Sequence, residues 1–153
     1  MTMLYIVIWK KYYLETANIE MALRRIDNTH WMFDEKLLCF RDITPGAAHH
    51  YLVIPRTHID NCKCLQAADI PLVERMVEMG WSVLKKTKLR NLDDVRIGFH
   101  IPPFSSVPHL HLHVLAPASE MTFKSQLHYG PQSHWFITVD KVLSQLKTRG
   151  KVK

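Results

Sequence analysis

The chain has 153 residues, of which 47% are hydrophobic and 22% charged, and these values are typical of one globular domain and exclude a disordered chain. The formal net charge of +6 suits a ligand that carries phosphate, or nucleic acid. A solvated basic tail is an equally good explanation, because residues 147–153 supply four of the positive charges. The chain contains three cysteines, Cys39, Cys62 and Cys64, and no two of them form a Cys-x-x-Cys pair. Neither a disulfide framework nor a zinc ribbon is therefore favoured, and we expect a reduced, intracellular protein.

The first predicted elements lie in a segment with weak patterns. Residues 4–9 are apolar, but six residues are too few to cross a membrane, which takes about 20. We interpret them as the start of a buried strand or helix. Residues 15–26 have a weak helical pattern.

Next in the chain, two apolar runs predict an antiparallel hairpin. Residues 37–40 and 49–55 are separated by Thr44-Pro45-Gly46, which is a turn signal. Because strand side chains alternate, His50 lies on the opposite face of its strand from Tyr51.

The second half of the chain predicts one long helix among strands. Residues 69–87 have apolar positions at helical spacing, with Asp69 as a capping residue. The remaining predictions are a strand, a histidine-rich strand, an edge strand and a short helix, over residues 95–99, 108–117, 133–139 and 140–147. This order predicts an α+β fold, with one long helix packed on an antiparallel sheet of about five strands.

The most informative feature is the stretch from Pro108 to Leu115, in which His109, His111 and His113 alternate with apolar residues. On a strand these three imidazoles line one face. A solvated face explains one or two histidines well and three poorly. A shared metal is strained, because the outer two histidines start roughly 13 Å apart on a straight strand. A catalytic row that faces an anionic substrate is the remaining interpretation.

A row of imidazoles suits transfer of a phosphorus-containing group. A neutral imidazole is a nucleophile that forms a covalent intermediate, and the middle histidine is the natural candidate. Mutual repulsion keeps at least one of the three neutral near pH 7. His50, on its separate strand, can face the same site, and the loop before the row offers the hydroxyls of Ser105 and Ser106.

The histidine row is part of a wider match to a known family. The pattern His-Leu-His-Leu-His-Val-Leu resembles the His-φ-His-φ-His-φ-φ motif of the histidine triad superfamily, where φ is apolar. Further segments resemble those that accompany the motif, over residues 41–45, 50–59, 98–104 and 133–138. The resemblance covers about residues 34–148 and implies an α+β sheet that pairs across a homodimer.

By this resemblance the chain is a hydrolase. It implies a nucleoside phosphoramidase that cleaves the P–N bond of adenosine 5'-monophosphoramidate through a nucleotidyl-histidine intermediate, with neither a cofactor nor a metal. His111 would be the nucleophile, with His109 and His113 as its support and His50 behind them. The AMP-type nucleotide would be bound by Asp42 at the ribose, Ile43 at the base, and Ser105, Ser106, His111 and His113 around the phosphate.

Two other functions stay open. His100 and Pro102-Pro103 stand where family members of the first type carry Asn and a Gly-rich loop. In this they resemble both the third type of the family and the aprataxin branch, which removes adenylate from DNA ends. The residues after the triad contain no Cys/His zinc module, which weighs against that function. The third function is a purine nucleotide-binding module without catalysis.

The resemblance also sets the expected organisation of the chain. Residues 1–33 do not match the family pattern, so we expect an atypical N-terminal segment, a histidine triad (HIT) domain over 34–148 and a basic tail over 149–153. We expect a cytoplasmic protein, small enough to enter the nucleus, that forms a homodimer or a higher homo-oligomer. Neither a membrane nor nucleic acid is an expected partner.

Overall fold

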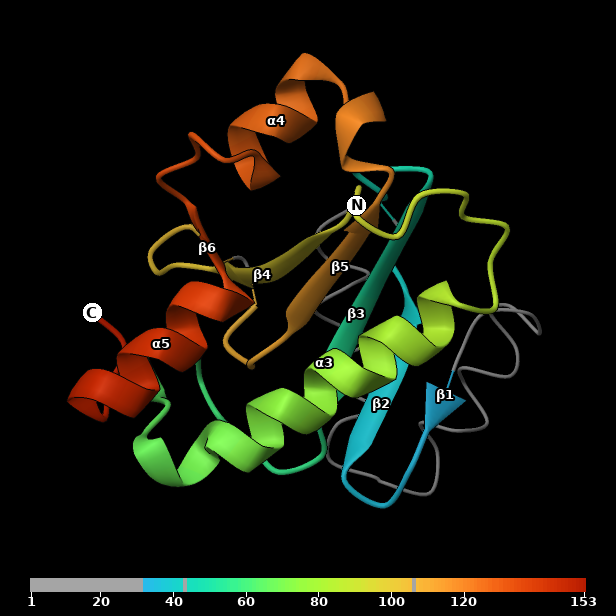
Figure 1. Cartoon of the computed structure of the whole chain (residues 1–153). Coiled ribbons are helices and arrows are strands. Elements are labelled where there is room, and N and C mark those ends of the chain that lie inside the picture. The colour runs from blue at the N-terminus through green and yellow to red at the C-terminus, as the bar shows by residue number, and fades with distance from the viewer. Residues whose placement is uncertain (1–31, 43, 106) are drawn as a thin grey trace. The chain divides into compact units, whose positions relative to one another are not determined.

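The computed structural model of the chain describes residues 32–42, 44–105 and 107–153. Met32–Lys153 form one compact unit, an antiparallel sheet in the order β1-β2-β3-β5-β4-β6 with helices packed on it (Figure 1). The strands are β1 Met32–Phe33, β2 Leu37–Arg41, β3 His49–Pro55, β4 Arg96–His100, β5 Leu112–Ala116 and β6 Phe136–Thr138. The helices are α3 Ile70–Leu84, α4 Phe123–Tyr129 and α5 Val139–Arg149, with short 3₁₀ turns at Cys62–Cys64, Ala67–Asp69 and Ala118–Glu120.

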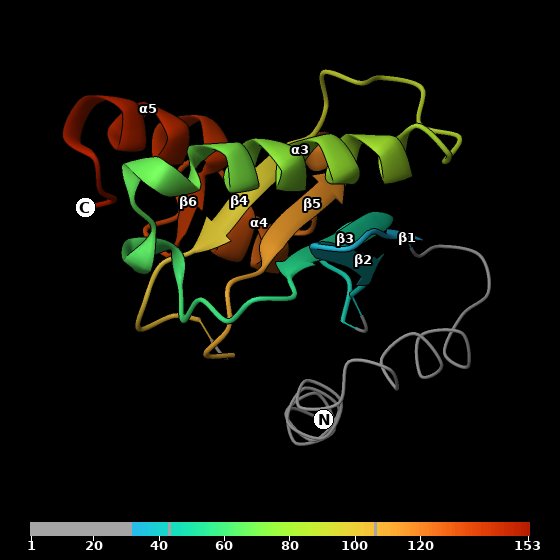
Figure 2. The ribbon, with the colours of Figure 1, turned by 90° about the horizontal axis from the view of Figure 1, so that it is seen from below.

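Helices α3 and α5 cover one face of this sheet, as Figure 2 shows. Alternation of side chains sends Tyr51 and Val53 of β3, and Leu112 and Val114 of β5, into the core on this side. Helix α3 comes close to the sheet at Gly80, where an added Cβ would lie 2.7 Å from Cγ2 of Val114. The glycine therefore sets how closely α3 packs on the sheet.

The opposite face of the sheet carries the polar residues. His113 of β5 lies opposite Leu52 of β3 and opposite Gly98 of β4, so the three residues share this face. Gly98 leaves room for β6, because an added Cβ would meet the Ile137 carbonyl and lie 2.7 Å from the ring of Phe136. The register thus places His113 in the middle of the sheet, with small or apolar neighbours on both sides.

Most of the predicted elements are confirmed, including the α+β class. The hairpin is β2–β3, the long helix is α3, and the predicted edge strand is β6, which pairs with β4 and runs directly into α5. The sheet has six strands rather than about five, and the additional strand, β1, contains two residues. The predicted elements over residues 4–9 and 15–26 lie outside the described residues, and the domain boundaries stay a prediction.

The prediction that all three triad histidines lie on one strand was wrong. Regular pairing begins at Leu112, so His109 and His111 lie in the segment that leads into β5. Pairing with β3 stops at Val53 and Leu112 although β3 itself runs to Pro55, because the chain before Leu112 bonds elsewhere: the N–H of Leu110 donates to the Ile59 carbonyl, at 2.7 Å. The alternation itself persists, because Leu110 is buried in the same core as Leu112.

Among the described residues, no helix is long and apolar enough to cross a membrane.

Substitution Gly80→Val is expected to lower the free energy of unfolding by about 1–3 kcal/mol, because the new side chain would push α3 away from Val114. Urea denaturation measures the change. Ser82→Val adds the same side chain at an exposed position of the same helix and serves as the control. Equal stability of the Gly80 and Ser82 variants would show that the close approach is not limiting.

Candidate active site

His111 is held in one tautomer by the backbone. Its Nδ1 lies 2.7 Å from the His109 carbonyl oxygen, and because a carbonyl only accepts, Nδ1 carries the hydrogen. Burial lowers the pKa of His111, so the ring is neutral at pH 7, and the hydrogen bond to His109 offsets this only in part. The lone pair of this neutral ring is therefore on Nε2, which is the form that a nucleophile requires.

His113 is held in the opposite tautomer by a chain of hydrogen bonds. The Gly46 N–H donates to Nδ1 of His50 at 2.9 Å, so the hydrogen of the neutral His50 ring is on Nε2. That Nε2 lies 2.9 Å from Nδ1 of His113, to which it donates. The hydrogen of His113 is therefore on its Nε2, an atom that is buried and has no hydrogen-bond partner among the described residues.

The pKa values of both rings agree with these neutral forms. Burial, then the neighbouring His100 and His111, lowers the pKa of His50 to about 3. Burial also lowers the pKa of His113 well below its usual value, and the nearby histidines add to this shift. The site therefore holds neutral imidazoles with fixed donors and acceptors until a ligand changes their surroundings.

His109 supports His111 from the other side. Its Nε2 donates to the Pro55 carbonyl at 2.9 Å, so Nδ1 accepts from Nδ1 of His58 at 2.8 Å. Nε2 of His58 lies 2.6 Å from a carboxylate oxygen of Asp60. Both ring nitrogens of His109 are thus engaged, and this fixes the residue whose carbonyl orients His111.

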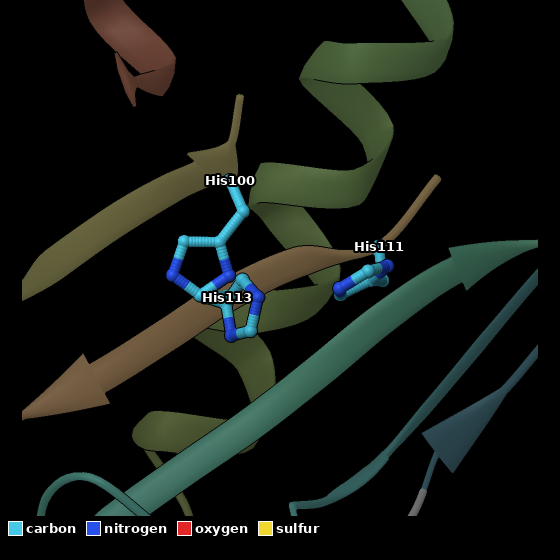
Figure 3. A group of neighbouring side chains, drawn as sticks. All are labelled: His100, His111 and His113. Carbon is cyan, nitrogen blue, oxygen red and sulfur yellow. The ribbon is translucent and has the colours of Figure 1, made fainter. Parts of the chain in front are cut away.

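His100 belongs to the site although the sequence marked it only as a departure from the family pattern. Its ring lies against His113 with centroids 4.5 Å apart, and one ring nitrogen each of His100, His111 and His113 lies within 4.8 Å of the others (Figure 3). The signal was present, because period-two alternation from Gly98 puts His100 on the face that carries His113.

Tyr129, at the end of α4, is the second residue that sequence reasoning missed. Its ring lies 4.9 to 5.2 Å from the rings of His50, His100 and His113. Nothing in the sequence signals this, because α4 reaches the site only through the path of the chain after β5.

The other predicted nucleotide ligands are less closely tied to the histidines. Asp42 is 8% exposed, accepts from the N–H and the hydroxyl of Thr44, and has its second oxygen 3.4 Å from Nε2 of His50. The Ser105 hydroxyl donates to the Val107 carbonyl within its own loop. Ile43 and Ser106 lie outside the described residues, and the roles of all four stay predictions.

Two groups of three residues have spacings that would suit a metal ion: His100, His111 and His113, and Asp42, His50 and His113. Both groups need a lone pair on His113. The hydrogen bonds that run from Gly46 through His50 occupy the lone pair on Nδ1 of His113 and place its hydrogen on Nε2. This arrangement suits an anion better than a cation.

The buried histidines predict that acid destabilises the fold. His50, with a pKa of about 3, and His100 and His109, each with a pKa of about 4, lie below the usual 6.5, so the unfolded chain binds more protons below pH 6.5. The free energy of unfolding is then at its highest above pH 6.5. It falls as the pH drops towards 4, by about 1.4 kcal/mol per pH unit for each such histidine.

Urea denaturation at pH 7, 6 and 5 checks this. His50→Gln should reduce the slope, whereas the exposed control His134→Gln should not. A free energy of unfolding that stays constant from pH 7 to pH 5 would contradict the neutral cluster.

Comparison with known proteins agrees with this site. The family model described as "Scavenger mRNA decapping enzyme C-term binding" matches residues 15–129, and so begins ahead of the boundary expected at residue 34. The adenosine 5'-monophosphoramidase HINT3 of Xenopus tropicalis is 49% identical over 114 residues, which are 74% of this chain and 74% of that protein. Aprataxin of Ciona intestinalis is more distant, at 27% identity over 78% of this chain and 32% of its own length.

A solved structure supports the same assignment. The HIT family hydrolase from Legionella pneumophila Philadelphia 1 superposes with a TM-score of 0.56 at 26% identity, covering 72% of this chain and 97% of that one. With the triad geometry, the family model and the 49% identity, the chain belongs to the histidine triad (HIT) family.

Proposed function

We propose that this protein is an adenosine 5'-monophosphoramidase, which hydrolyses the P–N bond of adenosine 5'-monophosphoramidate with His111 as its nucleophile. The observation that carries the proposal is the hydrogen bond from Nδ1 of His111 to the His109 carbonyl, which leaves the lone pair on Nε2. The high identity to relatives that bear this enzyme name supports the substrate class.

In the first step, Nε2 of His111 attacks the α-phosphorus, and a new P–N bond forms as the bond to the amine breaks. The amine leaves with the electron pair of the broken bond and takes up a proton from solvent, while the Nε2–H of His113 donates a hydrogen bond to a phosphoryl oxygen. The product of this step is adenylyl-His111 and the free amine.

In the second step, water attacks the same phosphorus. Its oxygen forms the new P–O bond as the bond to Nε2 of His111 breaks, and the proton that the water loses passes to solvent, which balances the proton taken up in the first step. AMP leaves, and the site returns to its starting tautomers. Both steps need positioning and charge stabilisation at the phosphoryl oxygens, which the Nε2–H donor of His113 provides.

The supporting residues act on orientation rather than on the substrate. His50 fixes the tautomer of His113, and His109 fixes the carbonyl that orients His111. The homodimer, the cytoplasmic location and the contacts of Asp42 with a ribose stay predictions of this proposal.

Substitution His111→Ala is expected to lower kcat on adenosine 5'-monophosphoramidate by roughly 10³-fold or more, because the nucleophile is lost. Intact-mass spectra of the quenched reaction should show an added adenylyl group on the unmodified protein and none on the variant. The exposed His134→Ala is the control, and it should retain both activity and adduct. Full activity of the His111 variant would overturn the proposal.

A further inference from the structure

We infer that Tyr129 is a positioning residue of the active site. Its ring packs on every member of the hydrogen-bonded chain from Gly46 through His50 to His113, here called the relay, and so keeps the hydrogen of His113 on Nε2. The catalytic consequence of this inference rests on the proposed function, in which that hydrogen is donated to a phosphoryl oxygen. Its structural part concerns the free protein and is measured without a substrate.

The ring of Tyr129 contacts all three members of the relay. Its centroid lies 5.2 Å from the ring centroid of His50, which it meets edge-on at 82°, and 5.2 Å from that of His113, at 56°. At Gly46 the approach is closest, because a Cβ added there would lie 2.9 Å from Cε2 of Tyr129. One side chain therefore touches the N–H that begins the relay and both imidazoles that follow it.

The contact with Tyr129 explains why residue 46 is a glycine. Gly46 does not have a positive φ, so its backbone conformation suits other residues as well. The atoms nearest to an added Cβ are two carbons of the Tyr129 ring, at 2.9 and 3.3 Å. The glycine and the ring thus fit each other closely, and the ring supports the turn whose N–H donates to Nδ1 of His50.

Hydrogen bonds from outside α4 fix the main chain that carries this ring. Nε of Arg96, on β4, donates to the Tyr129 carbonyl at 3.0 Å. The side-chain amide of Gln126, one turn earlier in the helix, donates to the Ala118 carbonyl at 3.1 Å. The position of Tyr129 is therefore set by the sheet as well as by its own helix, as a positioning role requires.

The ring of Tyr129, rather than its hydroxyl, has the properties that the relay needs. Burial, and then the charge of Asp42, raises the pKa of Tyr129, so the hydroxyl keeps its hydrogen at neutral pH and is not a base. The carbon surface of the ring offers neither a donor nor an acceptor. Water offers both, and water in its place would stabilise either tautomer of His50 and His113.

Two variants of Tyr129 test this inference with two readouts. Nuclear magnetic resonance of protein labelled with ¹⁵N in its histidines reports the tautomer of His113 at pH 7, and kcat on adenosine 5'-monophosphoramidate reports catalysis. Tyr129→Phe keeps the ring and should leave both unchanged. Tyr129→Ala should give ring-nitrogen shifts of His113 averaged between the two tautomers. It should also lower kcat by roughly tenfold or more, with a smaller change in KM, because a donor to the transition state is then present only part of the time.

Gly46→Ala tests the same contact from the other side. The new Cβ would displace the Tyr129 ring, so mixed tautomers of His113 and a similar loss of kcat are expected. In the double variant with Tyr129→Ala the Cβ has room, and the loss should be no larger than in Tyr129→Ala alone. If Tyr129→Ala does not fold, Gly46→Ala decides by the same two readouts.

Phe123→Ala is the matched control. It removes an aromatic ring from the same helix, at a position that is 80% exposed, and should change neither the tautomer of His113 nor kcat. A loss in this variant as large as in Tyr129→Ala would show that any damage to α4 has the same effect, and would overturn the inference.

The outcomes distinguish this inference from the proposed function. If Tyr129→Ala keeps the hydrogen of His113 on Nε2, or if Tyr129→Phe loses as much kcat as Tyr129→Ala, the inference is overturned and the phosphoramidase stands. If the unmodified protein hydrolyses no phosphoramidate, the proposed function is overturned, and the spectra alone decide whether Tyr129 sets the tautomer. Mixed tautomers and a lower kcat in Tyr129→Ala and Gly46→Ala, with neither in Tyr129→Phe, support the inference.

Discussion

Backbone hydrogen bonds fix which nitrogen of each active-site histidine carries a hydrogen, and the chemistry of the site depends on this constraint. The His109 carbonyl takes the hydrogen of His111, and the Gly46 N–H sets that of His113 through His50. Backbone groups cannot change their donor or acceptor role, so tautomers that they set are permanent features of the fold. One lone pair and one N–H are thereby held side by side in a buried site, where each is worth more than in water.

The sheet supplies the positions that these hydrogen bonds require. Pairing of β3 with β5 brings His50 and His113 to one face, and pairing of β4 with β5 brings His100 there. Gly98 keeps β6 close, and Gly80 lets α3 pack closely on the other face. The site therefore lies on packed secondary structure rather than on loops, although His109 and His111 lie just before their strand.

The sequence predicted much of this because alternation and spacing are local properties. The triad, its apolar partners, the hairpin and the long helix all follow from residues that are neighbours along the chain. The start of β5 could not be predicted, because it depends on the hydrogen bond between Leu110 and the distant Ile59 carbonyl, which draws the chain before Leu112 away from β3. His58, which holds His109, and Tyr129, which packs on three histidines, come from distant parts of the chain, and only the fold shows these contacts.

The central claim is that His111 and His113 carry their hydrogens on opposite ring nitrogens. Nuclear magnetic resonance of protein labelled with ¹⁵N in its histidines measures this at pH 7, because protonated and unprotonated ring nitrogens have well-separated chemical shifts. The account predicts a hydrogen on Nδ1 of His111 and on Nε2 of His113, with His50 in the same form as His113. A hydrogen on Nε2 of His111 in the free protein would contradict it, because that nitrogen would then have no lone pair for attack on phosphorus.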